Sequence, residues 1–466
     1  MNKVALILAA GRGTRMKSAT NKVLHPLLGR SMVGWVIDAV EEAGLKPIVV
    51  VGHQGEQVRA AFENHEPRIA FATQSIPKGT GHAVLSAISE LPEEGLCVVM
   101  CGDTPLFRAS TLNSLFEHHR SESERKGHSI WVTVLSACVS EPAAYGRIVR
   151  DENGAPLRIT EAANATKEEL SINEINTGTY LFDLAWLRSI LPTLSPHPPK
   201  QEIYLTDALE LAADEGRAAV VAMKDPKECQ GVNDRWALSE AQSSLQERIV
   251  REWASKGVGF EDPYSVTLEP AVELSSDVYI ERGAILRGNS KLGTGVRVGA
   301  YSVIQDTLVA EDVVVHPYTH IVSAQIEDGV SVGPFARIRE GTRLGEAVKI
   351  GNFVETKKAN FESGSKASHL SYIGDAQVGS KANIGAGTIT CNYDGYAKHK
   401  TNIGAGAFIG SNTALVAPVK VGAGAIIGAG STITKSVSED DISVARADQQ
   451  TRPGAAKKFR ARREAK

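Results

Sequence analysis

The first 230 residues alternate between short apolar runs and amphipathic stretches. Apolar runs near residues 4–10, 47–51, 96–100, 129–135 and 178–182 predict strands buried on both faces of a sheet. Between them, helical spacing predicts helices; in one of these, Ser31 is a candidate N-cap and Gly44 a candidate stop. This alternation predicts a mostly parallel α/β sheet, whose ligands bind outside the carboxyl ends of the strands.

After about residue 260, the period of the apolar pattern changes to six. The positions that keep this step are Leu268, Leu274, Ile280, Leu286, Leu292, Val298, Ile304, then Ile326, Val332, Ile338, Leu344, Ile350, then Tyr372, Val378, Ile384, and then Ile403, Ile409, Leu415, Val421, Ile427 and Ile433. One inward aliphatic in every six residues is typical of a parallel β-helix, with three hexads to each triangular coil. A flexible Gly-rich linker would not keep aliphatic residues in phase.

The two patterns are separated by one amphipathic stretch near residues 234–254, which predicts a linker helix. We therefore expect a doubly wound, Rossmann-like domain over 1–232, the linker helix over 233–256, a β-helix over 257–446 and a tail over 447–466. Residues 457–466 hold six Lys or Arg residues, so the tail is expected to be basic and flexible.

Composition limits the class of protein. The 466-residue chain is 42% hydrophobic and 23% charged, and its formal net charge of −3 gives no reason to expect a nucleic-acid partner. Its five cysteines form no CxxC pair, which favours a reducing compartment. No apolar run reaches the length of a membrane span, and cations directly follow residues 4–10 where a signal peptide would be neutral. We expect a cytoplasmic protein without membrane insertion.

A glycine-rich loop follows the first predicted strand. Gly11 and Gly13 let the backbone approach a ligand, and Arg12, Arg15, Lys17 and Lys22 add cationic side chains. This layout suits nucleotide phosphates, although a solvated glycine turn would share the spacing. The loop has neither the P-loop spacing nor the dinucleotide GxGxxG spacing.

Three further features suggest chemistry. Asp103 follows the strand predicted at 96–100 and suits Mg²⁺, although such an Asp is also a common turn former. His369 could act as a general base on an amine, although a lone histidine is often structural. An insertion, Cys391 to Lys400, interrupts the hexads, and loops excluded from a solenoid often carry function.

The loop resembles the LxxGxGxRM…K signature of sugar-1-phosphate nucleotidyltransferases, and residues 1–232 resemble the uridylyltransferase domain of the bifunctional GlmU family. The resemblance implies catalytic roles for Arg15 and Lys22 and Mg²⁺ ligation by Asp103 and Asn233. It implies UTP and N-acetylglucosamine-1-phosphate as substrates and pyrophosphate as a product. The nucleotide and sugar contacts implied in this sequence are Leu8, Ala9, Ala10, Gly11, Lys22, Gln74, Gly79, Thr80, Cys101, Gly102, Asp103, Gly146, Glu161, Asn176 and Asn233.

The second half resembles the acetyltransferase domain of the same family, a left-handed parallel β-helix that packs as a homotrimer. The resemblance implies that His369 deprotonates glucosamine-1-phosphate for attack on acetyl-CoA. The implied sugar-phosphate residues are Arg339, Lys357, Tyr372, Asn383 and Lys398, and the implied acetyl-CoA residues are Ala386, Asn392, Tyr393, Ser411, Ala429 and Arg446. Together the two activities would supply UDP-N-acetylglucosamine for peptidoglycan and lipopolysaccharide precursors.

This sequence departs from the family pattern at three positions. Asn21 replaces a Pro before the lysine, Cys101 stands where relatives often have Tyr, and Glu340 replaces a Pro and brings an acid beside an anion site. Two other functions are compatible with this pair of domains. One is a nucleotidyltransferase whose β-helix only oligomerises or regulates, and the other is a non-catalytic assembly subunit. The presence of the glycine loop, Asp103, His369 and the 391–400 insertion favours the bifunctional enzyme.

Overall fold

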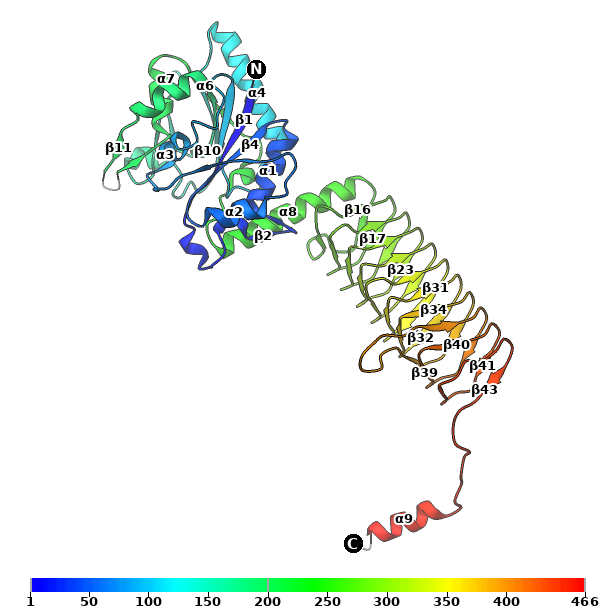
Figure 1. Cartoon of the computed structure of the whole chain (residues 1–466). Coiled ribbons are helices and arrows are strands. Elements are labelled where there is room, and N and C mark those ends of the chain that lie inside the picture. Colours follow the sequence, from blue (N-terminus) through cyan, green and yellow to red (C-terminus); the bar gives the residue numbers. More distant parts are fainter. Residues whose placement is uncertain (1, 199–200, 465–466) are drawn as a thin grey trace. The chain divides into compact units, whose positions relative to one another are not determined.

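The computed structural model of the chain describes residues 2–198 and 201–464. Its internal contacts divide the chain into two compact units, residues 1–245 and 246–466, which are drawn in Figure 1. The division falls inside helix α8 (Arg235–Ser255), the helix that the sequence predicts near 234–254. Residues of its second half, Ile249, Val250 and Trp253, pack against the core of the second unit.

The first unit contains a twisted sheet in the order β13-β7-β10-β6-β1-β4-β5. These strands are β13 (Ala218–Ala222), β7 (Val132–Cys138), β10 (Glu174–Asp183), β6 (Leu96–Cys101), β1 (Lys3–Ala9), β4 (Lys46–Val51) and β5 (Ala70–Thr73). All neighbours along this path are parallel except β10, which is antiparallel to both β6 and β7. The prediction of a mostly parallel sheet is therefore confirmed.

The strand predicted near 178–182 nevertheless runs against its neighbours. Between β7 and β10 the chain forms an antiparallel pair, β8 (Arg147–Arg150) and β9 (Pro156–Thr160), and the short helix α5 (Lys167–Leu170). A parallel strand would need a crossover, usually a longer helix packed on the sheet. The excursion through β8 and β9 therefore returns the chain in the opposite direction.

Helices cover both faces of this sheet. Apolar residues alternate along β1, so that Val4 and Leu6 pack into one core while Ala5 and Ile7 pack into the other. The first core includes residues of α3 (Thr80–Leu85), α6 (Leu184–Ile190) and α7 (Asp207–Asp214), and the second those of α1 (Met32–Glu42), α2 (Gly55–Ala61) and α4 (Ala109–Lys126). This three-layer arrangement leaves the carboxyl edge of the strands open for the loops.

Helix α1 begins as its sequence predicts. The Ser31 hydroxyl accepts a hydrogen bond from the backbone N–H of Gly34 at 3.1 Å, which satisfies one free donor of the first turn. Gly44, just beyond the end of the helix, has φ = 74°, a conformation that favours glycine.

The second unit is a prism of three parallel sheets, whose stacked coils run from β16 to β43 in Figure 1. The first sheet runs from β14 (Gly259–Phe260) to β43 (Ile442–Ser443), the second from β15 (Thr267–Leu268) to β42 (Thr432–Ile433), and the third from β16 (Glu273–Leu274) to β40 (Val419–Val421). Leu268, Leu286 and Ile304 follow one another in register, one coil apart, and all are fully buried. The hexad aliphatics thus form the core of the prism.

One position of the predicted hexads is wrong. Tyr372 does not enter the core; Ile373 does, in register with Thr356 of the preceding coil. That coil spans 17 residues from Thr356 to Ile373 rather than 18, so the strict six-residue step slips by one. Because side chains alternate along a strand, the slip turns Tyr372 outward.

The last segment contains a helix, α9 (Ala455–Glu464), within the tail that the sequence predicts to be flexible. Its residues are exposed, including Phe459 and the five cations of the helix. Among the described helices, none has both the length and the apolar composition that a membrane crossing requires.

Candidate active sites

A pocket of about 890 Å³ opens at the carboxyl edge of the first unit's sheet. It collects the loop after β1, the loop after β5, the start of α3 and the end of β6. The residues predicted from the sequence that line it are Leu8, Ala9, Ala10, Gly11, Arg15, Lys22, Gln74, Gly79, Thr80, Cys101, Asp103, Glu161 and Asn233. Loops that follow neighbouring parallel strands meet at one edge, which explains why such distant residues converge.

The centre of this pocket is the Lys22 ammonium. Its Nζ contacts the Asp103 carboxylate and lies 2.8 Å from Asn233 Oδ1. The Arg15 guanidinium donates to the same Asn233 oxygen at 2.7 Å. Two cations and two oxygen-bearing side chains therefore share one small volume, which suits an anionic ligand together with a hard metal ion.

The glycine loop is shaped to pass over Lys22. Gly13 has φ = 59°, and a Cβ added there would lie 2.4 Å from the Cβ of Lys22. A side chain at Gly13 would therefore displace the lysine. At Gly11, an added Cβ would meet nothing within 4 Å, so this backbone is left open to a ligand.

Asn21 holds the segment that carries Lys22. Its side-chain oxygen accepts from the N–H of Val23 at 3.1 Å, and its Nδ2 donates to the His53 carbonyl at 3.0 Å. Its own N–H donates to Gln57 Oε1 at 3.0 Å, and the residue is only 3% exposed. Hydrogen bonds of a buried amide thus hold this segment, which begins the short 3-10 helix Lys22–Leu24.

Three of the residues predicted for this site do not line the pocket. Gly102 bonds to the Leu8 carbonyl through its N–H at 2.9 Å and so fixes the turn that carries Asp103. The Asn176 N–H donates to the Gly146 carbonyl at 2.9 Å, and the Asn176 side chain donates to the Tyr180 hydroxyl at 2.7 Å. In this structure these residues support the pocket walls.

Two residues in the pocket wall have raised pKa values. Burial, followed by the nearby Asp207 and Glu202 carboxylates, raises the pKa of Glu161, although the Thr206 hydroxyl opposes this. Burial and the Asp103 carboxylate raise the pKa of the Cys101 thiol to about 12. Cys101 is therefore a neutral wall residue at pH 7 and no nucleophile.

Some lining residues were missed by the sequence analysis. Glu202 and Tyr204 reach the pocket from the segment after β11 (Pro196–His197), and Ala162 and Ala163 follow Glu161. Glu202 lies on the short strand β12 (Glu202–Ile203) and Tyr204 directly follows it, while Ala162 and Ala163 lie in a turn. None of these segments has a periodicity or motif that would mark them in the sequence.

On the prism, several predicted residues form one column. The strand register aligns five residues of successive coils, namely Lys349, Lys366, Asn383, Phe408 and Ile426. The column is formed by the residues three positions further along the chain from each of them. It consists of Asn352, His369, Ala386, Ser411 and Ala429. Adjacent coils are about 4.8 Å apart, so the column extends for roughly 19 Å. At its far end, the Arg446 guanidinium donates to the Ala429 carbonyl.

His369 is exposed on β32 (Lys366–His369), and its ring is oriented by the previous coil. Its Nδ1 lies 2.6 Å from Asn352 Oδ1 on β29 (Lys349–Asn352). An amide oxygen can only accept a hydrogen bond, so in the neutral imidazole Nδ1 carries the proton and Nε2 has the free lone pair. This is the state required of a general base. Asn352 was missed by the sequence analysis, although one-coil spacing could have identified it.

The predicted sugar-phosphate residues lie mainly on the adjoining sheet. Arg339 follows β27 (Arg337–Ile338), Lys357 ends β30 (Glu355–Lys357), and Tyr372 begins β33 (Tyr372–Gly374). These strands are consecutive neighbours. Asn383 belongs instead to the sheet of His369, on β35 (Asn383–Ile384).

Both cations are already paired with acids. Arg339 Nη1 lies 2.8 Å from Glu355 Oε1, and Lys357 Nζ lies 3.0 Å from Glu340 Oε1. Glu340 therefore points toward the cations, which the sequence alone could not establish.

The 391–400 insertion is held in shape by Asp394. Its carboxylate accepts the backbone N–H groups of Tyr396 and Ala397 and pairs with His399 Nε2 at 2.6 Å. These bonds hold the pKa of Asp394 far below its usual range. The backbones of Tyr393 and Lys398 form an antiparallel β-bridge within this loop, and Tyr393 is 61% exposed.

Asn392 ties the insertion to the prism. Its Nδ2 lies 2.6 Å from Asp375 Oδ2 and 3.4 Å from the Tyr372 hydroxyl. A residue predicted for acetyl-CoA and one predicted for sugar phosphate are thus adjacent.

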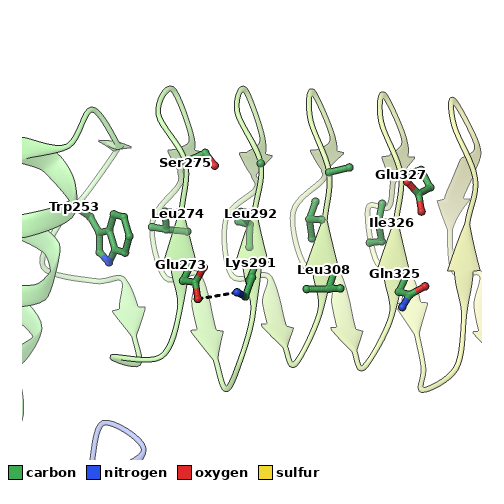
Figure 2. Close-up of a pocket in the computed structure, with 13 residues that line it drawn as sticks. Trp253, Glu273, Leu274, Ser275, Lys291, Leu292, Leu308, Gln325, Ile326 and Glu327 are labelled. Atoms are coloured by element: carbon green, nitrogen blue, oxygen red, sulfur yellow. Dashed lines mark ion pairs between the residues drawn. The ribbon is translucent and has the colours of Figure 1, made fainter. Parts of the chain in front are cut away.

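A further groove, of about 660 Å³, lies on another face of the prism. Figure 2 shows Trp253 at one end and the ion pair between Glu273 and Lys291, 2.9 Å apart, across two coils. None of the residues predicted for either site lines this groove.

Comparison with known proteins agrees with this architecture. The MobA-like NTP transferase domain family matches residues 5–166, and the bacterial transferase hexapeptide family, in six repeats, matches residues 400–435. These two domains define a two-domain transferase, a nucleotidyltransferase fold followed by a left-handed parallel β-helix.

Similarity extends over nearly the whole chain. Proteins named bifunctional protein GlmU are 46% identical in Heliobacterium modesticaldum, 45% in Trichlorobacter lovleyi and 41% in Marinobacter nauticus. The matches cover 96 to 97% of this chain and 96 to 97% of each relative. The chain belongs to the bifunctional GlmU family, which confirms the resemblance stated above.

Replacing Asn21 with Ala should loosen the segment that carries Lys22. The substitution removes an N-cap of about 1 kcal/mol, so amide exchange of residues 21–25 should accelerate roughly fivefold. Hydrogen exchange followed by mass spectrometry would measure this. Thr20→Ala, an exposed neighbour, is the control and should change nothing; equal protection in the two variants would contradict the role of Asn21.

Proposed function

We propose that the chain catalyses two successive reactions. The β-helix transfers an acetyl group from acetyl-CoA to glucosamine-1-phosphate, and the first unit then transfers UMP from UTP to the N-acetylglucosamine-1-phosphate formed, with release of pyrophosphate. The observation that carries the proposal is that a chain of a bifunctional family has both polar constellations assembled, one around Lys22 and one around His369.

In the nucleotide pocket, catalysis must overcome the repulsion between the negatively charged phosphates of the two substrates. Bringing a sugar phosphate to a triphosphate places several anions together, so catalysis depends on positioning and neutralisation. Arg15 and Lys22 would neutralise the phosphate oxygens and the leaving pyrophosphate. Gln74 and Thr80 line the same pocket and would contact the base, while Glu161, whose pKa is raised, lines the side proposed for the sugar.

The pocket also fits Mg²⁺. Asp103 and Asn233 each direct a side-chain oxygen at the Lys22 ammonium, and carboxylate and amide oxygens are the donors that hard cations take. These two residues would hold the ion, and substrate phosphates would complete its shell. The bound ion would offset phosphate charge.

In the β-helix, His369 Nε2 would remove a proton from the substrate amine. The amine nitrogen then bonds to the acetyl carbonyl carbon, the carbon–sulfur bond breaks, and CoA leaves as a thiol after taking up a proton. Asn352 keeps the imidazole in the required tautomer. The column from His369 through Ala386 and Ser411 to Ala429 would hold the extended acyl arm of acetyl-CoA.

We further propose a homotrimer in the cytoplasm, with the acetyl-CoA site completed by a neighbouring copy. Tyr301, Tyr318, Phe335 and Phe353 stack along one corner of the prism, with ring centroids 5.0 to 5.5 Å apart. Each is about half exposed, which forms an apolar ridge on a polar surface. Phe353 directly follows Asn352 in the chain, so a copy docked on this ridge would lie beside His369.

Asp103→Asn should reduce uridylyl transfer while leaving acetyl transfer intact. Loss of the carboxylate removes the charged ligand and the partner of Lys22, so kcat for pyrophosphate release should fall by roughly 10²-fold or more. Pyrophosphate and CoA release would be assayed on the same protein. Asp214→Asn, at the exposed end of α7, is the matched control, and wild-type pyrophosphate release by Asp103→Asn would remove Asp103 from the site.

His369→Ala should produce the opposite pattern. Without the base, acetyl transfer should fall by about 10³-fold, while UTP-dependent pyrophosphate release stays within twofold of wild type. Asn352→Ala should lower kcat by roughly tenfold, because the ring loses its orientation. His320→Ala, an exposed histidine on the same prism, serves as control; an equal loss of both activities in His369→Ala would argue against two independent sites.

The purified chain should behave as a trimer of 49.7-kDa subunits in light scattering. Phe335→Asp should lower the measured mass and acetyl transfer together, because it introduces charge into the apolar ridge, while uridylyl transfer persists. Leu157→Ala, an exposed apolar residue of the first unit, is the control. A wild-type monomer with full acetyl transfer would reject the trimer.

A further inference from the structure

Glu340 is a carboxylate inside the cation cluster proposed for the sugar phosphate. Its Oε1 lies 3.0 Å from Lys357 Nζ, and its Oε2 lies 3.7 Å from Arg339 Nε. Arg339 also pairs with Glu355 at 2.8 Å, and Glu355 Oε2 lies 3.8 Å from Arg337 Nη1. Three cations and two carboxylates therefore form one compact network.

Glu340 is more exposed than the lysine with which it pairs. Glu340 is 47% exposed at its side chain, whereas the Lys357 side chain that it pairs with is only 17% exposed. The acid is thus the outer partner, and an anion that approaches the ammonium meets the carboxylate as well. The hydrogen bond from Lys357 lowers the pKa of Glu340, so this carboxylate is ionised at neutral pH.

An anion can use this cluster only at the expense of the existing pairs. The Lys357 ammonium has three donors, one of which is directed at Glu340, so a phosphate must either displace the carboxylate or bind beside it. If it binds beside the acid, it experiences repulsion that grows with the anion's own charge. Either way, part of the attraction of Lys357 and Arg339 is already cancelled.

We propose that Glu340 is an internal counter-ion that competes with the substrate phosphate for Lys357 and Arg339, and thereby sets the affinity of the β-helix for its phosphorylated acceptor. The inference rests on the acetyl transfer proposed above and deepens it. Glu340 weakens binding of the acceptor without contacting the reacting atoms. It also selects against anions of higher charge, because their repulsion by the carboxylate is greater.

The test is Glu340→Gln in the full-length protein, which removes the charge and keeps the size. The KM for glucosamine-1-phosphate at saturating acetyl-CoA should fall by about fivefold, with kcat unchanged, because removing one like charge near a phosphate lowers its repulsion by this order. Inorganic phosphate, titrated calorimetrically, should bind Glu340→Gln tighter by a similar factor, and pyrophosphate should gain more than phosphate. Glu346→Gln, an exposed acid in the same coil but at the next corner of the prism, is the matched control.

The outcomes are separable. The counter-ion role would be overturned if Glu340→Gln left both the KM and the phosphate affinity unchanged, or raised the KM and weakened phosphate binding. A change in kcat alone would overturn it as well. If the wild-type protein failed to acetylate glucosamine-1-phosphate, the proposed acetyl transfer would be rejected. Tighter phosphate binding by Glu340→Gln would then still support Glu340 as the counter-ion of an anion site.

Discussion

The contact of the Lys22 ammonium with the oxygens of Asp103 and Asn233 is the interaction on which the geometry of the first unit's pocket, and the uridylyl transfer proposed for it, depends. It joins residues 81 and 211 positions from the lysine, so it exists only once the sheet has assembled its carboxyl edge. Neighbouring residues maintain this geometry. Gly13 clears space for the lysine, and the buried Asn21 holds the segment that carries it.

In the β-helix, side chains are brought together mainly by the repetition of the coils rather than by loops. Each coil repeats the previous one, so side chains in register form columns, and His369 receives its orienting partner from the coil before it. The insertion at 391–400 adds polar groups that the repeat itself cannot supply, and Asp394 gives this loop a defined shape. A rigid prism thus positions groups that sequence distance would not associate.

In both sites, cationic side chains are paired with carboxylates of the same chain. Lys22 is paired with Asp103, and Lys357 and Arg339 are paired with Glu340 and Glu355, within the same chain. Cations gathered without counter-ions would repel one another and destabilise the fold. Pairing makes the clusters stable in the absence of substrate, and it means that binding must exchange one set of partners for another.

Local patterns explain how much could be predicted. Leu268, Leu286 and Ile304 are buried in register as the six-residue step predicts, because one aliphatic per hexad is a constraint that each coil meets locally. Ser31 caps α1 as predicted, because an N-cap also depends only on residues within one turn of the helix. The prediction failed at Tyr372, where a coil shortened to 17 residues shifted the alternation by one, and at β10, whose direction depends on the path of the chain before it.

By itself, the sequence determined the two architectures, their order along the chain and the candidate residues that motifs mark, because periodicity and turn chemistry act over a few neighbouring residues. Only the tertiary structure decided that Asn21 holds the lysine segment, that Asn352 orients His369, and that Glu340 pairs with Lys357. Those contacts join residues 17 or more positions apart. Their geometry is set by how strands and coils stack, which local patterns do not specify.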